Sequence, residues 1–175
     1  MLDLQKGQVL DLKKEDGTSI SKIRVGLSWD VSEGKTMDLD LFAHHKESKA
    51  TAYFGAKTAI NGLILSDDNL TGEWDGDDEF LKMDAVTTVD GEYFICVNIY
   101  DAESKGQSLK DVTNAEATIY DDVSGAVLAK YNMTADGGDN TSIIVGKVTD
   151  SDEDYKFEAI WTYLKGDINQ VVAAL

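Results

Sequence analysis

Carboxylate side chains are concentrated in one short stretch of the sequence, SDDNLTGEWDGDDE at residues 66–79. Half of its residues are acidic and none is basic, and two glycines give its backbone the freedom to turn. Carboxylates this close together repel one another and raise one another's pKa values unless they are solvated or a cation neutralises them. Because carboxylate and amide oxygens are the ligands that Ca2+ prefers, we favour a cation site over a solvated acidic surface.

The stretch can be matched to the spacing of an EF-hand loop, in which oxygen ligands recur about every second residue around a turn glycine. With Asp67 as the first ligand, Gly72 is the turn glycine. The remaining ligand positions then fall on Asn69, Thr71, Glu73, Asp75 and Asp78. The terminal glutamate of an EF-hand is absent and strands are predicted on both sides, so we expect an EF-like loop only. Since Ca2+ takes about six to eight oxygens, Asp38, Asp40 and Asp101, at edges or ends of predicted strands, are candidates to complete the shell.

Other chemistries are less favoured by the sequence. His44 and His45 are adjacent and there is no second cysteine, so we expect no zinc site and place both histidines at the surface or at a sheet edge. Nucleophile-elbow, P-loop and dinucleotide-binding glycine motifs do not occur. A catalytic pair of carboxylates stays open because acids are abundant. Trp29 and Trp161 lie in strand patterns and are expected in the core, whereas Trp74 lies in the acidic stretch and is the tryptophan that we expect to be exposed.

Apolar patterns predict the elements that must position these acids. KIRVGLSW at 22–29 alternates apolar and polar residues, which is typical of a strand with one buried face. DLDLFAHH at 38–45 places Asp38 and Asp40 on the same face of an extended chain. EYFICVNIYDA at 92–102 is apolar on both faces, which predicts a central, doubly covered strand. ATIYDDVSGAVLAKYNM at 117–133 predicts a hairpin.

Further short strands are predicted at 4–12, 50–55, 62–65, 80–89, 141–148 and 156–164. Apolar residues at helical spacing predict one helix over 167–175, with Asp167 as its N-cap. Many short strands and one terminal helix indicate an all-β protein, an antiparallel β-sandwich with a short C-terminal helix. No repeat or linker divides the sequence, so we expect a single domain over 1–175.

Composition limits the classes of partner. The 175 residues carry a net charge of −17, which argues against nucleic-acid binding and against attraction to an anionic membrane. Neither a transmembrane-length apolar run nor a signal-peptide pattern occurs, so we expect a cytoplasmic protein that does not insert into a membrane. The one cysteine, Cys96, lies in an apolar run and is expected to be a buried hydrophobic residue.

Several short motifs together resemble the TerD family of tellurium-resistance and stress-response proteins. They are DN at 68–69, TGE at 71–73, DGDDE at 75–79, LQKGQ at 4–8, VGLSWD at 25–30, DLD at 38–40, IYDA at 99–102, QS at 107–108, AKYNMT at 129–134 and KFEAI at 156–160. The resemblance implies a β-sandwich that binds calcium and has no established catalytic activity. The ligand candidates that it implies are Asp68, Asn69, Asp75, Asp77, Asp78 and Glu79, with Asp38, Asp40 and Asp101. The sequence departs from the family pattern at Trp74, Ser28 and Tyr100.

We therefore expect a non-enzymatic, calcium-binding protein of the TerD type that acts in a bacterial response to tellurite, chemical stress or phage. In this hypothesis calcium orders residues 66–79 for contact with other stress-response proteins of the same system. One alternative is a calcium-dependent carbohydrate-binding module that uses an exposed Trp74. A second alternative is a glycosidase with two catalytic carboxylates.

Overall fold

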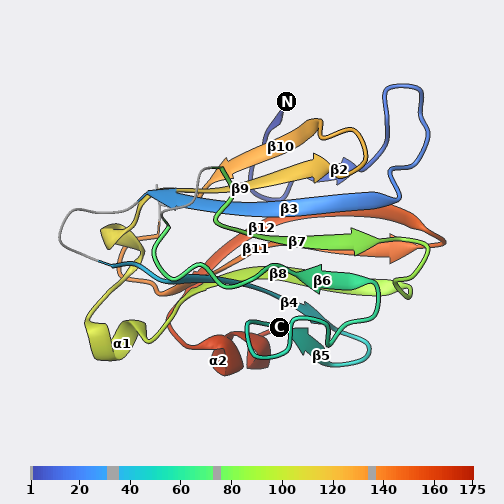
Figure 1. Cartoon of the computed structure of the whole chain (residues 1–175). Helices are drawn as coiled ribbons and strands as arrows, with labels where there is room; N and C mark the ends of the chain where they lie inside the picture. Colours follow the sequence, from blue (N-terminus) through green and yellow to red (C-terminus); the bar gives the residue numbers. More distant parts are fainter. Residues whose placement is uncertain (1, 31–35, 73–75, 134–136) are drawn as a thin grey trace.

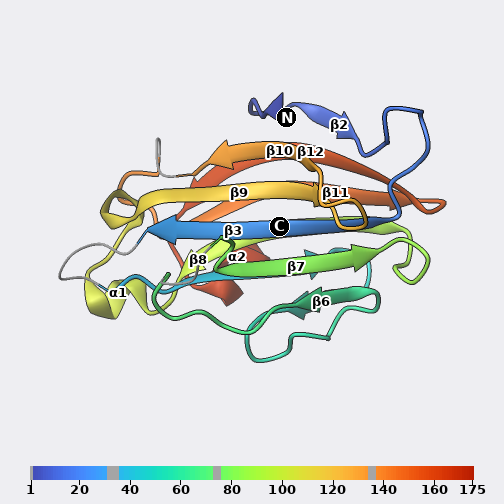
Figure 2. The ribbon, with the colours of Figure 1, turned by 45° about the horizontal axis from the view of Figure 1, so that its top comes forward.

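The computed structural model describes residues 2–30, 36–72, 76–133 and 137–175. Within these residues the strands form two six-stranded sheets that are stacked face to face, as two views show (Figures 1 and 2). Neighbouring strands are antiparallel except for β1 (Leu2–Asp3), which runs parallel to β10 (Val127–Asn132). The predicted antiparallel β-sandwich with a short C-terminal helix is confirmed.

The first sheet contains β1, β10, β3 (Lys22–Asp30), β6 (Leu63–Leu65), β7 (Glu79–Asp84) and β9 (Thr113–Asp121). Its strand order is β1-β10-β9-β3-β7-β6. The second sheet contains β2 (Val9–Asp11), β4 (Leu39–His45), β5 (Ala50–Ala52), β8 (Gly91–Ile99), β11 (Ser142–Ser151) and β12 (Asp154–Leu164). Its strand order is β2-β12-β11-β8-β4-β5. The helices are α1 (Ala102–Lys105), the 3-10 helix η1 (Leu109–Asp111) and α2 (Ile168–Ala173).

The main core lies between the two sheets, and β3 shows how the sequence builds it. Its alternating apolar residues, Ile23, Val25, Leu27 and Trp29, are all buried. This agrees with the one-faced strand predicted from the alternation, and it places Trp29 in the core as expected.

Strand β8 is covered on both faces, which explains why its sequence is apolar without alternation. It lies between β11 and β4 in the second sheet. On the face away from the main core, Cys96 packs with Phe42, Ile144 and Val171 in a separate buried cluster, to which α2 contributes Val171. The prediction of a central strand and of a buried cysteine is confirmed.

Helix α2 begins as the sequence predicts. The Asp167 carboxylate accepts a hydrogen bond from the Gln170 backbone N–H at 2.9 Å, and the Gln170 side-chain oxygen accepts one from the Asp167 N–H at 2.9 Å. Reciprocal bonds of this kind satisfy backbone donors that the first turn leaves without partners. No helix in the described ranges is long and apolar enough to cross a membrane.

The prediction that His44 and His45 lie at the surface is wrong, because both are buried. The two rings point to opposite faces of β4, as adjacent strand residues must, but here both faces are covered. His44 Nδ1 lies 2.8 Å from Thr51 Oγ1, while the His45 ring stacks on Tyr93 with 4.3 Å between centroids.

Candidate metal centre

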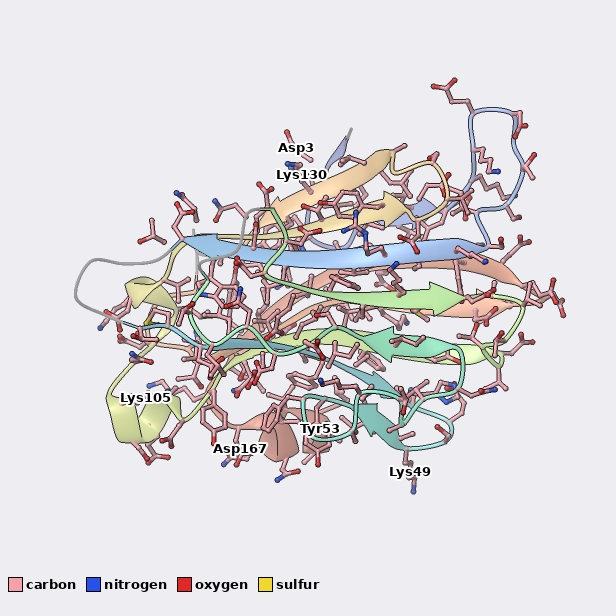
Figure 3. The ribbon with its side chains drawn as sticks, viewed as in Figure 1. Asp3, Lys49, Tyr53, Lys105, Lys130 and Asp167 are labelled. Atoms are coloured by element: carbon pink, nitrogen blue, oxygen red, sulfur yellow. The ribbon has the colours of Figure 1, made fainter. Side chains whose placement is uncertain are left out.

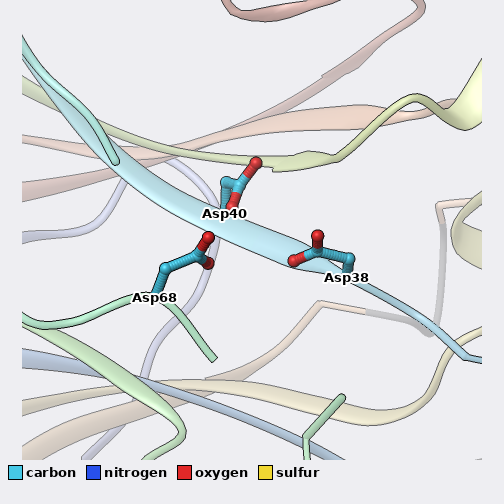
Figure 4. A group of neighbouring side chains, drawn as sticks. All are labelled: Asp38, Asp40 and Asp68. Carbon is cyan, nitrogen blue, oxygen red and sulfur yellow. The ribbon is translucent and has the colours of Figure 1, made fainter. Parts of the chain in front are cut away.

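Three aspartates from two separate parts of the chain come together at the beginning of β4, on the face of this strand that points away from the main core. Asp38 directly precedes β4, Asp40 lies on β4, and Asp68 lies in the connection from β6 to β7 (Figure 4). One carboxylate oxygen from each lies within 4.8 Å of the corresponding oxygens of the other two. Asp38 and Asp40 are buried and Asp68 is half-buried. Because β4 belongs to the second sheet and β6 and β7 to the first, this three-aspartate cluster joins both sheets.

Glu79, the first residue of β7, links the two parts of the cluster. Strand β5 pairs with β4 only at Ala43–His45, so the beginning of β4 has no strand partner on that edge. The Leu41 N–H at this edge donates to Glu79 Oε2 at 2.8 Å, and the Asn69 N–H donates to Glu79 Oε1 at 3.2 Å. One carboxyl group therefore satisfies a buried strand edge and fixes the backbone beside Asp68.

Asn69 and Asp78 hold the connection in place from within. Asn69 Oδ1 accepts hydrogen bonds from the backbone N–H groups of Thr71 at 3.1 Å and Gly72 at 3.0 Å, which forms a local turn. Its Nδ2 donates to Asp78 Oδ1 at 3.0 Å, and Asp78 Oδ2 accepts from the Trp29 N–H at 2.9 Å. Both side chains are almost completely buried, so they fasten the connection to β3.

Burial favours the protonated forms of three acids in this region when no cation neutralises them. Burial, together with the charges of Asp38 and Asp68, raises the pKa of Asp40 to about 8. Burial and the charge of Asp68 raise the pKa of Asp38 to about 6. Burial also raises the pKa of Glu79 to about 9, although the two backbone N–H donors oppose that shift. A divalent cation at the cluster would replace these protons with two positive charges.

The donor atoms fit a hard cation. Asp38 Oδ1, Asp40 Oδ2 and Asp68 Oδ1 are buried oxygens that accept no hydrogen bond from any residue that the structure describes. A buried polar atom without a partner costs roughly 1–3 kcal/mol. The cluster consists of carboxylates alone, with no histidine or cysteine. An all-oxygen set of this kind is typical of a calcium or magnesium site and not of a zinc site.

Five predicted ligands in the described part of the chain are not among the three clustered aspartates: Asn69, Asp78 and Glu79, which hold the connection in place, and Asp77 and Asp101. Asp77 Oδ2 forms an ion pair with Arg24 at 2.9 Å, and its Oδ1 accepts from the Tyr120 hydroxyl at 3.2 Å. Asp101 is exposed at the beginning of α1 and is not one of the three clustered aspartates. Sequence reasoning missed Arg24 and Tyr120 as partners of Asp77, because neither has a pattern that distinguishes it from other residues on a solvated strand face.

The EF-like spacing that begins at Asp67 does not describe the cluster. Asp67 lies at the surface, where its carboxylate is 2.8 Å from Lys57 Nζ, and the neighbouring Asp68 is the residue that faces β4. The predicted residues Glu73, Trp74 and Asp75 fall outside the described residues.

Comparisons with known proteins place the chain in a family. The TerD domain profile matches residues 1–174. General stress protein 16U from Bacillus subtilis (strain 168) is 31% identical, over 97% of this chain and 94% of its own length. Tellurium resistance protein TerD from Serratia marcescens is 30% identical, over 98% and 95%.

Solved structures share the fold. A homologue of telluride resistance protein (TerD) from Streptomyces coelicolor A3(2) superposes with a TM-score of 0.70 at 16% identity, covering 87% of this chain and 95% of that one. A crystal structure of a protein of unknown function gives a TM-score of 0.74 at 18% identity, covering 89% and 96%. With the domain match and the relatives at about 30% identity, the chain belongs to the TerD family.

Proposed function

We propose that this protein is a non-enzymatic, calcium-binding member of the TerD family that acts in a bacterial stress response. The observation that carries the calcium proposal is the three-aspartate cluster: one oxygen of each carboxylate lies within 4.8 Å of the others, and each aspartate has a buried oxygen without a hydrogen-bond partner among the described residues. The stress role is supported by the names of relatives, which include tellurium resistance, general stress and chemical-damaging agent resistance proteins.

In this proposal the chain holds the cation with Asp38 and Asp40 on one side and Asp68 on the other. Calcium, when bound, supplies the charge that allows all three aspartates to stay ionised. Glu79 and Asn69 keep Asp68 opposite β4 through the hydrogen bonds described above. Binding to the folded state alone adds about 2.7 kcal/mol to the free energy of unfolding when calcium is at a hundredfold excess over Kd.

The connection that calcium would order also presents an apolar side chain outward. Leu70, two residues after Asp68, is 56% exposed, and Asp67 beside it is at the surface. We infer that this surface contacts other stress-response proteins of the same system. A Leu70→Asn variant should keep calcium binding but lose partners that co-purify with the wild-type protein in calcium. Equal recovery of those partners by both proteins would remove this part of the proposal.

Calcium titration by calorimetry tests the site itself. Asp40→Asn removes one cluster carboxylate, and Asp67→Asn is the matched control because it removes the same charge from the surface of the same acidic region. We expect one binding event to be lost or strongly weakened in Asp40→Asn and kept in Asp67→Asn. Identical titrations of both variants and the wild-type protein would refute the assignment.

The stress role needs a test in cells. A strain that lacks the gene should regain tellurite or chemical-stress tolerance with the wild-type protein and with Asp67→Asn, and not with Asp40→Asn. The alternative of a carbohydrate-binding module depends on Trp74, which lies outside the described residues. The glycosidase alternative needs two acids that face an open cleft, whereas Asp38 and Asp40 are buried.

A further inference from the structure

A groove between α1 and α2 lies beside the three-aspartate cluster and shares no lining residue with it. It consists of two adjoining cavities of about 500 and 410 Å³, and Asn98, Asp101 and Asp167 line both of them. These volumes are in the range of small-molecule sites, which is about 300–1,000 Å³. Asp167 lies at the beginning of α2, close to Tyr53 along the lower edge of the molecule in Figure 3, with Lys105 of α1 on the other side. We call this feature the α1–α2 groove.

One wall of the groove is aromatic. Tyr53, Phe54 and Tyr100 line its second cavity and contact one another edge to face, with ring centroids 5.4 Å and 5.7 Å apart. Phe54 and Tyr100 are 37% and 45% exposed, which is unusual for two neighbouring rings. The Lys105 ammonium already lies 5.2 Å from the centre of the Tyr100 ring. This ring is therefore placed where it attracts a cation.

The polar groups at the centre of the groove are acceptors. Asn98 is almost completely buried, and its Nδ2 donates to Ser142 Oγ at 2.6 Å and to the Gly166 carbonyl at 2.8 Å. These two bonds use its donor group and leave Oδ1, which accepts no hydrogen bond from a described residue, as the atom available to a ligand. The Asp101 carboxylate does not cap α1, and neither Asp101 nor Asp167 forms an ion pair with a described residue.

The charge of the groove is complementary to a cation. Glu103 and Asp139 add two more carboxylates to the first cavity, against one lysine, Lys165, and Asp139 is already paired with Lys110. Inorganic cations prefer acids that converge on one point, and among the described residues only the three-aspartate cluster does so. An uncharged sugar would leave the carboxylates without a counter-charge.

We propose that the α1–α2 groove binds an aliphatic organic ammonium ligand of the polyamine class. Its ammonium groups would donate to Asn98 Oδ1 and to the carboxylates of Asp101 and Asp167, and its hydrocarbon segments would lie on Tyr100 and Phe54. The N–H donors of such a ligand match the hydrogen-bond acceptors of the groove, and its hydrocarbon segments match the aromatic rings. The two sites are neighbours, because Asn98 pairs with Asp40 across β8 and β4 and the Tyr100 N–H donates to the Asp38 carbonyl at 2.8 Å. They have no lining residue in common, so the inference does not require that the cluster binds calcium.

The test is an NMR titration of the full chain with spermidine, in saturating calcium and at constant ionic strength. Tyr100→Leu removes the ring and keeps the charge, and Asp167→Asn removes a charge but keeps an N-cap side chain for α2. Neither residue belongs to the three-aspartate cluster, and calcium titration of each variant by calorimetry checks that the neighbouring cluster is unchanged. The matched control is Asp16→Asn, in an exposed turn between β2 and β3, where asparagine can keep the bond to the Thr18 N–H.

We expect saturable binding that shifts amide signals at 98–101 and 166–170. Tyr100→Leu and Asp167→Asn should each raise the dissociation constant about two- to fivefold, while Asp16→Asn leaves it nearly unchanged. If Asp16→Asn weakens binding as much as Asp167→Asn, or if Tyr100→Leu has no effect, the attraction is a property of the whole acidic surface and the proposal fails. Stoichiometric displacement of spermidine by additional calcium would also overturn it.

Discussion

Replacing Asp40 by asparagine should have opposite effects on stability with and without calcium. The pKa of Asp40 is about 8 in the folded chain against 3.8 for an exposed aspartate, so the calcium-free folded protein holds a proton that the unfolded chain releases. The contribution of Asp40 to the free energy of unfolding is therefore greatest below about pH 4 and falls as the pH rises towards about 8. Asparagine cannot ionise, so the variant should lose this dependence.

The size of the effect follows from the same shift. Each pH unit between the two pKa values removes about 1.4 kcal/mol, so the wild-type protein loses up to about 4 kcal/mol through Asp40 by pH 7. Without calcium, Asp40→Asn should therefore melt about 10 °C above the wild-type protein at pH 7 and much closer to it at pH 4. With excess calcium the order should reverse, because the wild-type protein gains the binding energy and the variant lacks a ligand.

Thermal unfolding followed by circular dichroism, with a calcium chelator or with excess calcium, measures both halves of this prediction. Asp67→Asn should behave like the wild-type protein in every condition, because Asp67 is exposed and pairs only with Lys57. The reasoning fails if Asp40→Asn keeps the wild-type pH dependence in chelator. It also fails if calcium raises the melting temperature of Asp40→Asn as much as that of the wild-type protein.

Three further predictions concern the surroundings of the cluster. Gly72→Ala should lower the free energy of unfolding by about 2–3 kcal/mol, because Gly72 has φ +73° and a Cβ there would overlap the Trp29 indole. Urea unfolding measures this, and an unchanged urea midpoint would contradict it. Arg24→Met should cost about 1 kcal/mol, because it breaks the partly exposed pair with Asp77. It should keep the calcium stoichiometry seen by calorimetry, and an additional or tighter site would show that Asp77 can act as a ligand. Burial raises the pKa of the Cys96 thiol, so Ellman's reagent should react with it only after unfolding. Rapid reaction of the native protein would show that helix α2, which covers Cys96 through Val171, moves away from it.

The fold was predictable because its signals are local. Alternation on 22–29, the unbroken apolar run at 92–102 and the capping residue Asp167 each follow from the period or the end chemistry of one element. The strand at 38–45 was predicted with two aspartates on one face, and the structure brings both of them into the cluster. The same strand misled us about His44 and His45, since a strand pattern does not say that both faces will be covered.

The details of the candidate site were less predictable because they depend on contacts between distant segments. Several sets of acids in residues 66–79 have a spacing that could surround a cation. Asp68 lies near Asp38 and Asp40 at the beginning of β4, whereas Asp67 points to the surface, and this difference depends on where β4 lies in the fold. Asp77 reads as a ligand in the sequence, but Arg24, far away in the chain, lies beside it in the folded protein. In the sequence nothing distinguishes Glu79 from the neighbouring acids. Its bond to the Leu41 N–H forms because β5 is too short to pair with β4 at Leu41.

The hydrogen bond from Leu41 to Glu79 crosses from one sheet to the other. Most of the contact between the two sheets is made by apolar side chains, whose contacts are non-directional and resist sliding weakly, and the Tyr131–Tyr163 hydroxyl pair adds a second polar link farther away. The Leu41–Glu79 hydrogen bond is directional, and together with the three aspartates beside it, it fixes the position of one sheet relative to the other. If calcium binds there as proposed, its removal would allow a small displacement of one whole sheet relative to the other. Residual dipolar couplings measured with and without calcium would detect that displacement far from the site, at the opposite ends of β3 and β11.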